Sequence, residues 1–432
     1  MSNALFWFRR DLRFNDNAGL FEALKSGLPV VPVFIFDTEI LNQLNSKHDK
    51  RVHLIHQRLA FMHAQLQTYN SGLVVRYGKA QDVMIDLCSE FNVSHIYCNE
   101  DYEPQAIVRD TSILNIAAAK NITFTSFKDQ VVFAKNEVLK PDGTPYTIFT
   151  PYSKKWKSLL AETSIVNYQS ELLLNNLFKA ANLTLPSLAE IGFEPTDVCW
   201  AEPLLSEHLL KNYAETRNFP ALENGTSHLS VHLRFGTVSV RQMVQKAMAT
   251  NEQFLNELIW REFFMMILFH FPNVAKHSFK PKYDEIPWRI NEADFERWCM
   301  GQTGYPLVDA GMRELNATGL MHNRVRMVVA SFLVKHLLID WRWGEAYFAQ
   351  KLLDYDLSAN NGNWQWAAGC GCDAAPYFRV FNPTEQLKKF DCDFKYTRRW
   401  VPEIDELDYT QPIVEHTFAR NRVLEVLKKA LA

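Results

Sequence analysis

Short hydrophobic runs alternate with helical periodicity over the first 130 residues of the chain. Apolar runs of this length are typical of buried strands, and they lie at residues 5–8, 30–36, 73–75, 95–98 and 122–124. Between them, residues 51–66 and 80–91 carry helical patterns. Alternation of strands and helices predicts a parallel sheet with right-handed crossovers. We therefore expect an α/β domain with a Rossmann-like parallel sheet over residues 1–130, although no G-x-G-x-x-G follows the first run.

The pattern changes after residue 130. A turn is predicted at residues 141–143 (PDG), and from about 162 to 203 the periodicity weakens and prolines recur. We interpret residues 131–203 as a long interdomain connection. Helical periodicity then dominates, as at residues 308–315, 324–338 and 343–353. The sequence therefore predicts a larger all-α domain over residues 204–432.

The composition is that of an ordinary soluble globular protein, with 47% hydrophobic and 22% charged residues in 432. No secretory signal is expected, and the most apolar stretch, residues 259–271, carries Arg261, Glu262 and His270 and predicts no membrane span. Seven cysteines without a C-x-x-C motif favour a reducing, cytoplasmic location. Cys370 and Cys372 lack nearby partners, so no metal site is expected.

The net charge of −3 and the pI of about 6.5 argue against a nucleic-acid partner. Residues 376–400 nevertheless hold six basic side chains against three acidic ones. This local excess permits a phosphate-binding surface, although such runs are usually solvated faces.

Several spaced motifs resemble the photolyase/cryptochrome family, most closely the class I cyclobutane pyrimidine dimer photolyases. They are FWFRRDLR at 6–13, GYP at 304–306, MHNR at 321–324, NNGNWQW at 360–366 and DAAP at 373–376. The resemblance implies an α/β domain joined by a long loop to a helical FAD domain. It also implies a monomeric carbon–carbon lyase that uses FAD and light to split dimers flipped out of UV-damaged DNA. A signalling photoreceptor without repair activity and a plain electron-transfer flavoprotein are the alternatives.

A cluster of hydroxyl side chains precedes a helical segment at residues 225–230 (GTSHLS). Such a cluster is usually a helix cap, but a helix start also suits a pyrophosphate. The resemblance assigns the FAD phosphates to Thr226, Ser227, His228, Leu229 and Ser230. Many relatives have Arg where this chain has His228. By the same resemblance, further cofactor contacts come from Tyr213, Arg217 and Phe254, the last in the place of a Trp near the adenine.

Two aspartates and an asparagine follow one predicted helix. Asp354 and Asp356 would ordinarily belong to a solvated turn or a cap. By resemblance, Asp354 pairs with Arg326 beside the flavin ring, Asp356 contacts the flavin or its ribityl chain, and Asn360 faces flavin N5. An amide accepts the N–H of reduced flavin, so Asn360 favours repair over plant-type receptors, which carry Asp.

Glu257, Trp260 and Arg261 fall on one face of a predicted helix. An amphipathic helix with an i, i+4 salt bridge would explain this spacing. The resemblance instead implies a lesion pocket, since a dimer must be flipped out of the stack to be repaired. Trp260 and Trp366 would wall that pocket, and its rim would hold Asn323, Arg324 and Met327. Asn323 and Met327 argue against a (6-4) photoproduct as the substrate.

Three tryptophans, Trp364, Trp341 and Trp288, match the residues that pass electrons to photoexcited flavin in the family, and Trp343 is a potential branch. As isolated residues they would be core aromatics. With Glu257 and Asn360, they complete the predicted catalytic set.

A second, antenna chromophore is also expected, but Tyr102-Glu103 is followed by Pro104, which speaks against folate. The sequence does not decide whether the antenna site holds a deazaflavin, holds a second flavin or is empty.

Overall fold

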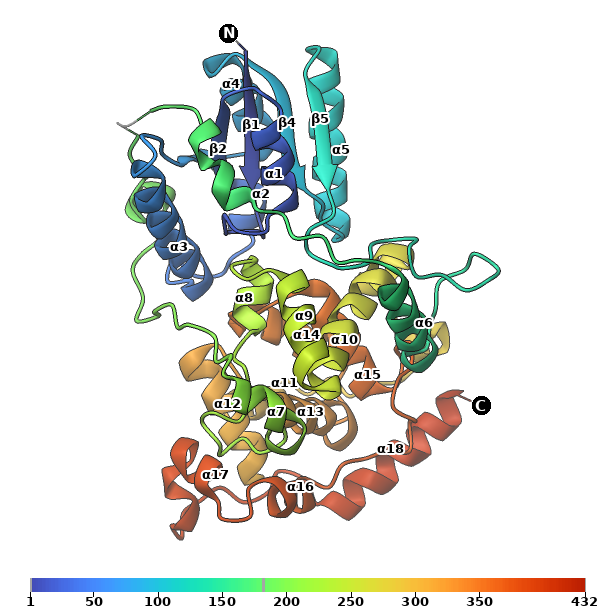
Figure 1. Ribbon diagram of the computed structural model, residues 1–432. Coiled ribbons are helices and arrows are strands. Elements are labelled where there is room, and N and C mark those ends of the chain that lie inside the picture. The colour runs from blue at the N-terminus through green and yellow to red at the C-terminus, as the bar shows by residue number, and fades with distance from the viewer. Residues whose placement is uncertain (1, 181–182, 432) are drawn as a thin grey trace. The chain divides into compact units, whose positions relative to one another are not determined.

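The computed structural model describes residues 2–180 and 183–431, and they fall into two compact units. Of the described residues, the first unit comprises 2–138, 155–180, 183–203 and 229–249, and the second comprises 139–154, 204–228 and 250–431. Figure 1 shows the chain from its N-terminal strands to its C-terminal helix. In the described part of the chain, no helix combines the length and apolarity needed to cross a membrane.

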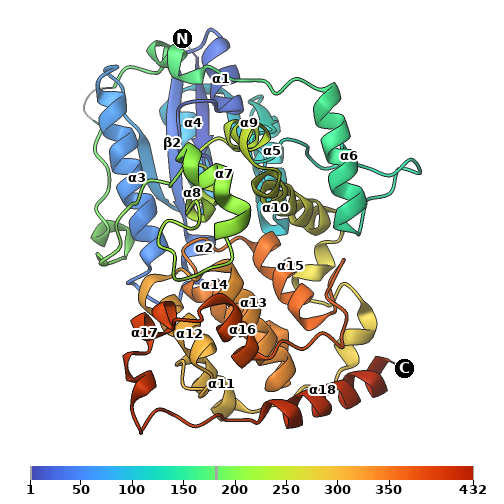
Figure 2. The same cartoon turned by 60° about the horizontal axis from the view of Figure 1, so that its bottom comes forward.

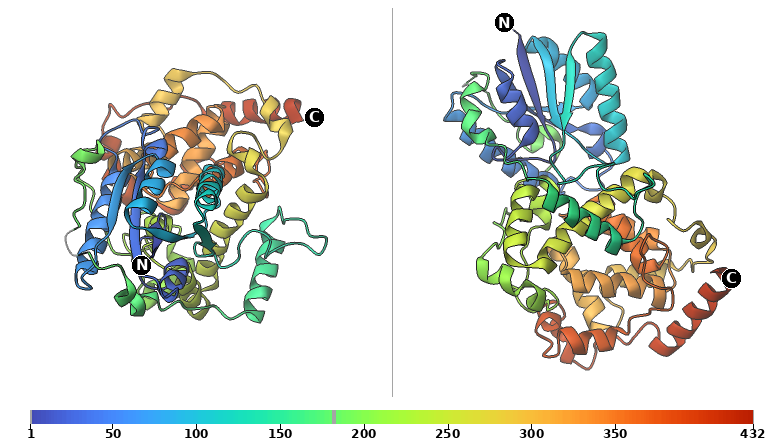
Figure 3. Two further views of the ribbon diagram at one scale, coloured as in Figure 1. Left: turned by 90° about the horizontal axis from the view of Figure 1, so that it is seen from above. Right: turned by 45° about the vertical axis from the view of Figure 1, so that its right-hand side comes forward.

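The first unit is built on five strands that are all parallel, in the order β3-β2-β1-β4-β5. Figure 3 shows strands of this sheet side by side. They are β1 (Asn3–Phe8), β2 (Val30–Asp37), β3 (Val74–Gly78), β4 (Val93–Asn99) and β5 (Thr123–Phe127). The helices of this unit are α1 (Ala18–Lys25), α2 (Thr38–Leu41), α3 (Lys50–Gln67), α4 (Ala80–Glu90), α5 (Pro104–Ala119), α8 (Ser230–Phe235) and nearly all of α9 (Val240–Thr250). The predicted α/β class and parallel sheet are confirmed.

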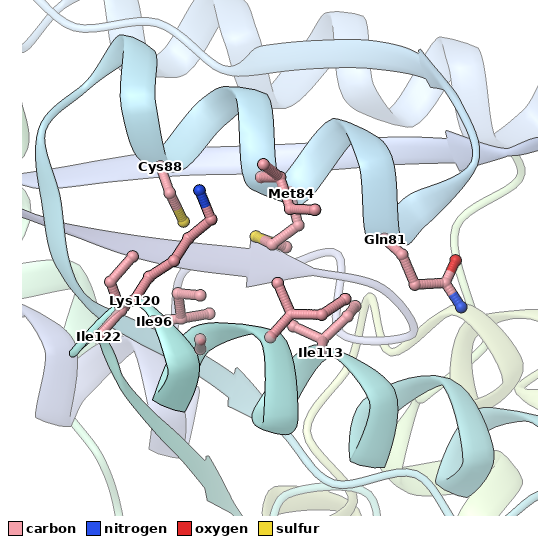
Figure 4. A pocket seen from close by; sticks show the side chains of 10 residues that line it. Gln81, Met84, Cys88, Ile96, Ile113, Lys120 and Ile122 are labelled. Carbon is pink, nitrogen blue, oxygen red and sulfur yellow. The ribbon is translucent and has the colours of Figure 1, made fainter.

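Alternate residues of each strand face opposite layers of helices, because successive strand side chains point to opposite faces. Leu5 and Trp7 join a core with residues of α4 and α5, whereas Phe6 and Phe8 join one with residues of α1 and α3. Burial on both faces explains why the strands read as continuous apolar runs. A small apolar hollow lies beside α4 and α5, with Met84 among its lining residues (Figure 4).

The compact units do not follow the predicted domain limits. Residues 229–249 pack with the sheet, where Arg241 Nη2 lies 2.8 Å from Asp129 Oδ1 and Leu12 N donates to Phe235 O at 3.0 Å. Burial alone would raise the pKa of Asp129, but Arg13 and Arg241 hold it below its usual value. This buried charge network could not be read from periodicity. Each compact unit is made of several separate stretches of the chain, so the domain limits predicted at residues 130 and 203 stay a proposal.

The second unit is helical, as predicted (Figure 2). Its helices are α7 (Glu207–Thr216), α10 (Glu252–His270), α11 (Glu292–Cys299), α12 (Pro306–Thr318), α13 (Asn323–Ser331), α14 (Trp341–Lys351), α15 (Leu357–Ala368), α16 (Pro383–Phe390), α17 (Lys395–Trp400) and α18 (His416–Leu431), while α6 (Phe149–Glu162) divides between the units. The helical pattern predicted over residues 324–338 resolves into α13 followed by one π-helical turn over Phe332–His336.

Two glycines allow the helices around the site to approach closely. A Cβ atom at Gly362 of α15 would overlap the ring of Phe264 on α10. A Cβ at Gly344 of α14 would overlap the indole of Trp364 on α15. Helix α15 therefore lies in close contact with both α10 and α14, and it carries Asn360.

Candidate functional site

The segment predicted to bind phosphates spans the limit between the two compact units. His228 adopts a left-handed backbone conformation with φ of 51°, and its Nε2 lies 3.1 Å from Glu223 O. Helix α8 begins at Ser230, and the residue before it, Leu229, makes no side-chain capping bond. The predicted hydroxyl cap is therefore not formed by the residue at the cap position. Ser227 is buried and its carbonyl accepts from Leu204 N at 3.0 Å.

Arg326 and Asp354 form an ion pair, with Nη2 and Oδ2 2.9 Å apart. The Asp354 side chain is only 3% exposed, whereas that of Arg326 is 27% exposed. Arg326 Nε also donates to Met321 O at 2.8 Å. Two fixed contacts thus orient the guanidinium at the start of α13, next to a nearly buried carboxylate.

Asp356 and Asn360 lie at the start of α15. Asp356 is the N-cap of this helix, and its Oδ1 accepts from Ala359 N at 3.1 Å. Asn360 Nδ2 donates to Glu345 Oε1 at 2.8 Å, which directs the amide carbonyl oxygen away from Glu345. Burial raises the pKa of Glu345, and the Asn360 hydrogen bond offsets part of that rise. Glu345 was not predicted, because its partner lies fifteen residues away on another helix.

Glu257 is held from outside its own helix. It forms an ion pair with Arg217, the residue that caps the C-terminus of α7. Gln253 Nε2, one turn earlier on α10, donates to the same Glu257 oxygen at 2.7 Å. An i, i+4 pair with Arg261 is therefore not needed to explain this carboxylate.

Tyr213 and Phe254 complete a cluster between α7 and α10. Their rings meet edge to face with centroids 5.2 Å apart, and the Arg217 guanidinium lies 5.6 Å from the Tyr213 centroid. Burial, reinforced by the Glu257 carboxylate, raises the pKa of Tyr213 to about 12. The structure therefore brings together four of the predicted site residues: Tyr213, Arg217, Phe254 and Glu257.

Three phenylalanine rings contact the indole of Trp260, which is half-buried. Phe149, the first residue of α6, stacks flat against it with centroids 3.7 Å apart and an interplanar angle of 5°. Phe263 and Phe264 contact the indole at 5.6 and 5.5 Å. Phe149 was missed by sequence reasoning, since neither its spacing nor a motif marks it.

The side chains predicted for the pocket rim lie on α13. Arg324 donates to Asn218 Oδ1 at 2.7 Å and stacks on Phe390 with its guanidinium carbon 4.4 Å from the ring centroid. Its Nη1 also lies 3.6 Å from the Met327 sulfur. Asn323 is exposed at the first position of the helix. These contacts hold the Arg324 head group at the surface of the second unit, where it remains half-buried.

The N-cap of α13 is His322, whose Nδ1 accepts from Arg324 N at 3.1 Å. Burial and then the nearby Arg326 and Arg324 lower the pKa of His322 to about 4. The imidazole is therefore neutral at pH 7 and stays an acceptor for the helix N-terminus.

The three predicted electron-transfer tryptophans differ in exposure. Trp364 and Trp341 are buried, and Trp288 is half-buried. The indole of Trp364 also meets that of Trp298 with centroids 6.1 Å apart. Through Phe295, Trp298 leads toward Trp343, the residue predicted as a branch. Trp298 was not predicted, because no motif distinguishes it from other core aromatics.

Most basic residues between 376 and 400 have acidic neighbours. Ion pairs join Lys388 to Glu385, Lys395 to Asp393, Arg398 to Asp405 and Arg399 to Glu223. These pairs are exposed, so each contributes little to stability. They reduce the local positive charge that the sequence indicated.

The helical unit, together with the family that it matches, defines the chain as a flavoprotein with a helical cofactor-binding part. Residues 254–422 match the family described as the FAD binding domain of DNA photolyase, and residues 4–168 match the one described as DNA photolyase. The chain is 35% identical to the deoxyribodipyrimidine photo-lyase of Escherichia coli, over 100% of this chain and 99% of that protein. The chain belongs to the DNA photolyase family.

Solved structures agree with this membership. A bacterial class III photolyase from Agrobacterium tumefaciens superposes with a TM-score of 0.86 at 32% identity, covering 100% of this chain and 98% of the other. An archaeal photolyase from Sulfolobus tokodaii, solved with two FAD molecules, gives 0.79 at 34% identity, covering 99% and 100%. At 35% and 32% identity, the curated photo-lyase and the class III structure are about equally similar to this chain, so these comparisons support the class I resemblance only loosely.

Proposed function

We propose that this protein is a deoxyribodipyrimidine photo-lyase that uses FAD and blue or near-UV light to split cyclobutane pyrimidine dimers in DNA. The full-length similarity to photo-lyases supports the reaction class. The observation that carries the substrate assignment is the placement of Trp260 and Glu257 on one helix: an indole held flat and a carboxylate held by Arg217. A flat apolar surface beside an oriented acceptor suits a flipped base.

The donor set of the second unit fits FAD. The Arg326–Asp354 pair offers a fixed charge to a planar ring, and the oriented Asn360 carbonyl offers an acceptor to a ring N–H. Bound FAD supplies the light-excited electron for dimer cleavage. We assign the phosphates to the segment from Thr226 to Ser230, with Asp356 beside the flavin. We also assign contacts with the cofactor or the DNA to Tyr213, Arg217 and Phe254.

The chain's own residues bind and orient the lesion in this proposal. Glu257 accepts a hydrogen bond from a pyrimidine, and Trp260 and Trp366 stack on the dimer. Arg261, Asn323 and Met327 complete the pocket and its rim.

Arg324 contacts a flanking phosphate, a position supported by its fixed contacts to Asn218 and Phe390.

Electrons that keep the cofactor reduced are delivered by Trp364, Trp341 and Trp288. The progression from buried to half-buried indoles supports this direction of transfer.

We propose a second chromophore as an antenna, because one solved relative carries two FAD molecules. In this chain Glu103, before Pro104, is engaged by Arg10 and Arg234. We propose that a flavin is a better candidate for the antenna than folate.

We also propose a monomeric, cytoplasmic protein. The seven free cysteines of the described residues support a reducing compartment.

Light-driven turnover tests the proposed function. The FAD-loaded, chemically reduced protein is mixed with an oligonucleotide that carries one thymine dimer. Blue light should restore the two thymines, and a dark control should leave the dimer intact. Bound and reduced FAD without turnover would instead identify a photoreceptor.

A further inference from the structure

The flat contact between Phe149 and Trp260 has an unusual geometry for two protein side chains. Aromatic pairs usually meet edge to face or offset at larger separations. Here the ring centroids lie 3.7 Å apart and the planes differ by 5°. This spacing is close to the ~3.4 Å between stacked bases. Phe149 therefore lies flat on one face of the indole and restrains its plane.

Phe149 is itself anchored in the second unit. Its backbone N donates to Asp373 Oδ2 at 3.1 Å, so a carboxylate from the loop after α15 satisfies the first N–H of α6. Asp373 adopts a left-handed conformation with φ of 47°. The edge of Phe263 meets the Phe149 ring at 5.9 Å. The hydrogen bond to its backbone and the edge contact with Phe263 therefore restrain the Phe149 ring.

We propose that Phe149 is a positioning residue for lesion recognition: it backs Trp260 so that the opposite face of the indole is presented, in a fixed plane, to the flipped dimer. This inference rests on the proposed function. Because Phe149 already restrains the indole, less side-chain freedom is lost when the dimer stacks on it. Asp373 connects this support to the loop that follows Trp366, the second wall of the proposed pocket.

A different arrangement would give the opposite result. If Phe149 occupied the place of the flipped base, the ring would have to leave before the dimer entered. Its removal would then tighten binding of damaged DNA. The backing role predicts weaker binding, so the sign of the effect separates the two arrangements.

The experiment compares Phe149→Ala and Phe149→Leu in the FAD-loaded protein. Leu fills space without presenting a flat ring, so it keeps the assignment testable if the Ala variant folds poorly. A matched control is Phe418→Ala, which removes an exposed phenylalanine from α18. Equilibrium binding to duplexes with and without one dimer is measured in the dark. Flavin content by absorbance reports on the integrity of each variant.

Both Phe149 variants should weaken dimer binding by about two- to tenfold, the effect of one aromatic pair, with unchanged binding to undamaged DNA. Light-driven repair should need more substrate for half-saturation but reach the wild-type rate at saturation. In a Trp260→Ala background, Phe149→Ala should have no further effect, since there is no indole left to position. Phe418→Ala should match the wild type.

Unchanged or tighter dimer binding in both variants would overturn the positioning role, as would equal losses on damaged and undamaged DNA. An additive loss in the Trp260→Ala background would also overturn it. If the wild type itself shows no preference for dimer-containing DNA, the proposed function fails and the role of Phe149 falls with it. A wild-type preference that stays undiminished in Phe149→Leu and Phe149→Ala overturns the positioning role alone.

Discussion

The Arg326–Asp354 ion pair brings opposite charges together where an unpaired charge would be costly. Asp354 is nearly buried, and both of its carboxylate oxygens lie within hydrogen-bonding distance of Arg326 Nη2. Arg326 keeps about a quarter of its side chain exposed. Water can therefore solvate the arginine in part, and loss of its partner should cost less than for a fully buried pair.

Replacing Asp354 with Ala should therefore lower flavin retention and stability together. We expect a loss of about 3 kcal/mol or less in the free energy of unfolding, the lower end for truncating a buried pair. Flavin absorbance relative to protein, measured after purification, gives the occupancy. Asp354→Asn keeps the shape without the charge and serves as the control. Full occupancy in Asp354→Ala would refute the cofactor role of the pair.

Trp364→Phe should separate photoreduction from repair. Phenylalanine is much harder to oxidise than tryptophan, so rapid photoreduction of the oxidised cofactor should disappear while flavin binding persists. Repair by protein that is chemically reduced beforehand should survive. The measurement is the decay of oxidised-flavin absorbance under blue light with an external reductant. Photoreduction at the wild-type rate would mean that electrons reach the flavin without passing through Trp364, and Trp343 would be the next residue to replace.

At the scale of elements, the site depends on how closely three helices approach. Helix α15 lies against α10 where Gly362 meets Phe264 and against α14 where Gly344 meets Trp364. These contacts bring residues more than ninety positions apart into one site. The hydrophobic pattern of each helix indicates which face is buried, but it does not specify the partner helix.

Gly344→Ala should destabilise the helical unit although alanine favours helices. The added methyl group would overlap the Trp364 indole, and overpacking of this kind costs about 1–3 kcal/mol. Chemical denaturation followed by tryptophan fluorescence measures the change. Gln350→Ala, at an exposed position of the same helix, should be nearly neutral. A Gly344→Ala protein as stable as the wild type would show that α14 and α15 can separate without cost.

At the scale of the whole molecule, the sequence predicted the fold class and the family more completely than the contacts. Alternating apolar runs identified the sheet, because side chains buried on both faces leave a clear pattern. The flat stack of Phe149 on Trp260 joins residues 111 positions apart, and no local pattern encodes it. For the same reason, the partner of Glu257 and the buried bonds of Arg241 to Asp129 emerged only from the three-dimensional structure.

Stability should depend on pH through buried histidines. His336 is fully buried, its Nε2 lies 2.8 Å from His416 Nδ1, and Arg422 donates to its carbonyl oxygen. Burial and then His416 lower the pKa of His336 to about 3. An unfolded histidine takes up a proton near pH 6.5, so the stabilisation is complete above that pH and is lost as the pH falls toward 3.

His336→Asn removes this proton linkage. The difference in unfolding free energy between the wild type and this variant should shrink by about 1.4 kcal/mol per pH unit below pH 6.5. Urea unfolding at pH 7, 6 and 5 measures it. A difference that stays constant over that range would mean that His336 titrates alike in the folded and unfolded states.

The central claim is that Trp260 and Arg324 belong to a site for a flipped pyrimidine dimer, and paired binding measurements test it most directly. Trp260→Ala and Arg324→Ala are compared with the wild type in the dark, at several salt concentrations, on duplexes with and without one dimer. Trp260→Ala should weaken binding to dimer-containing DNA alone, by about 1–3 kcal/mol for lost stacking.

Arg324→Ala should weaken binding to both duplexes alike and reduce the salt dependence by about one phosphate contact. The two variants thus separate recognition of the base from contact with the backbone. Equal losses on both duplexes for Trp260→Ala would contradict the account, because the indole would then be a core residue and the lesion would bind elsewhere.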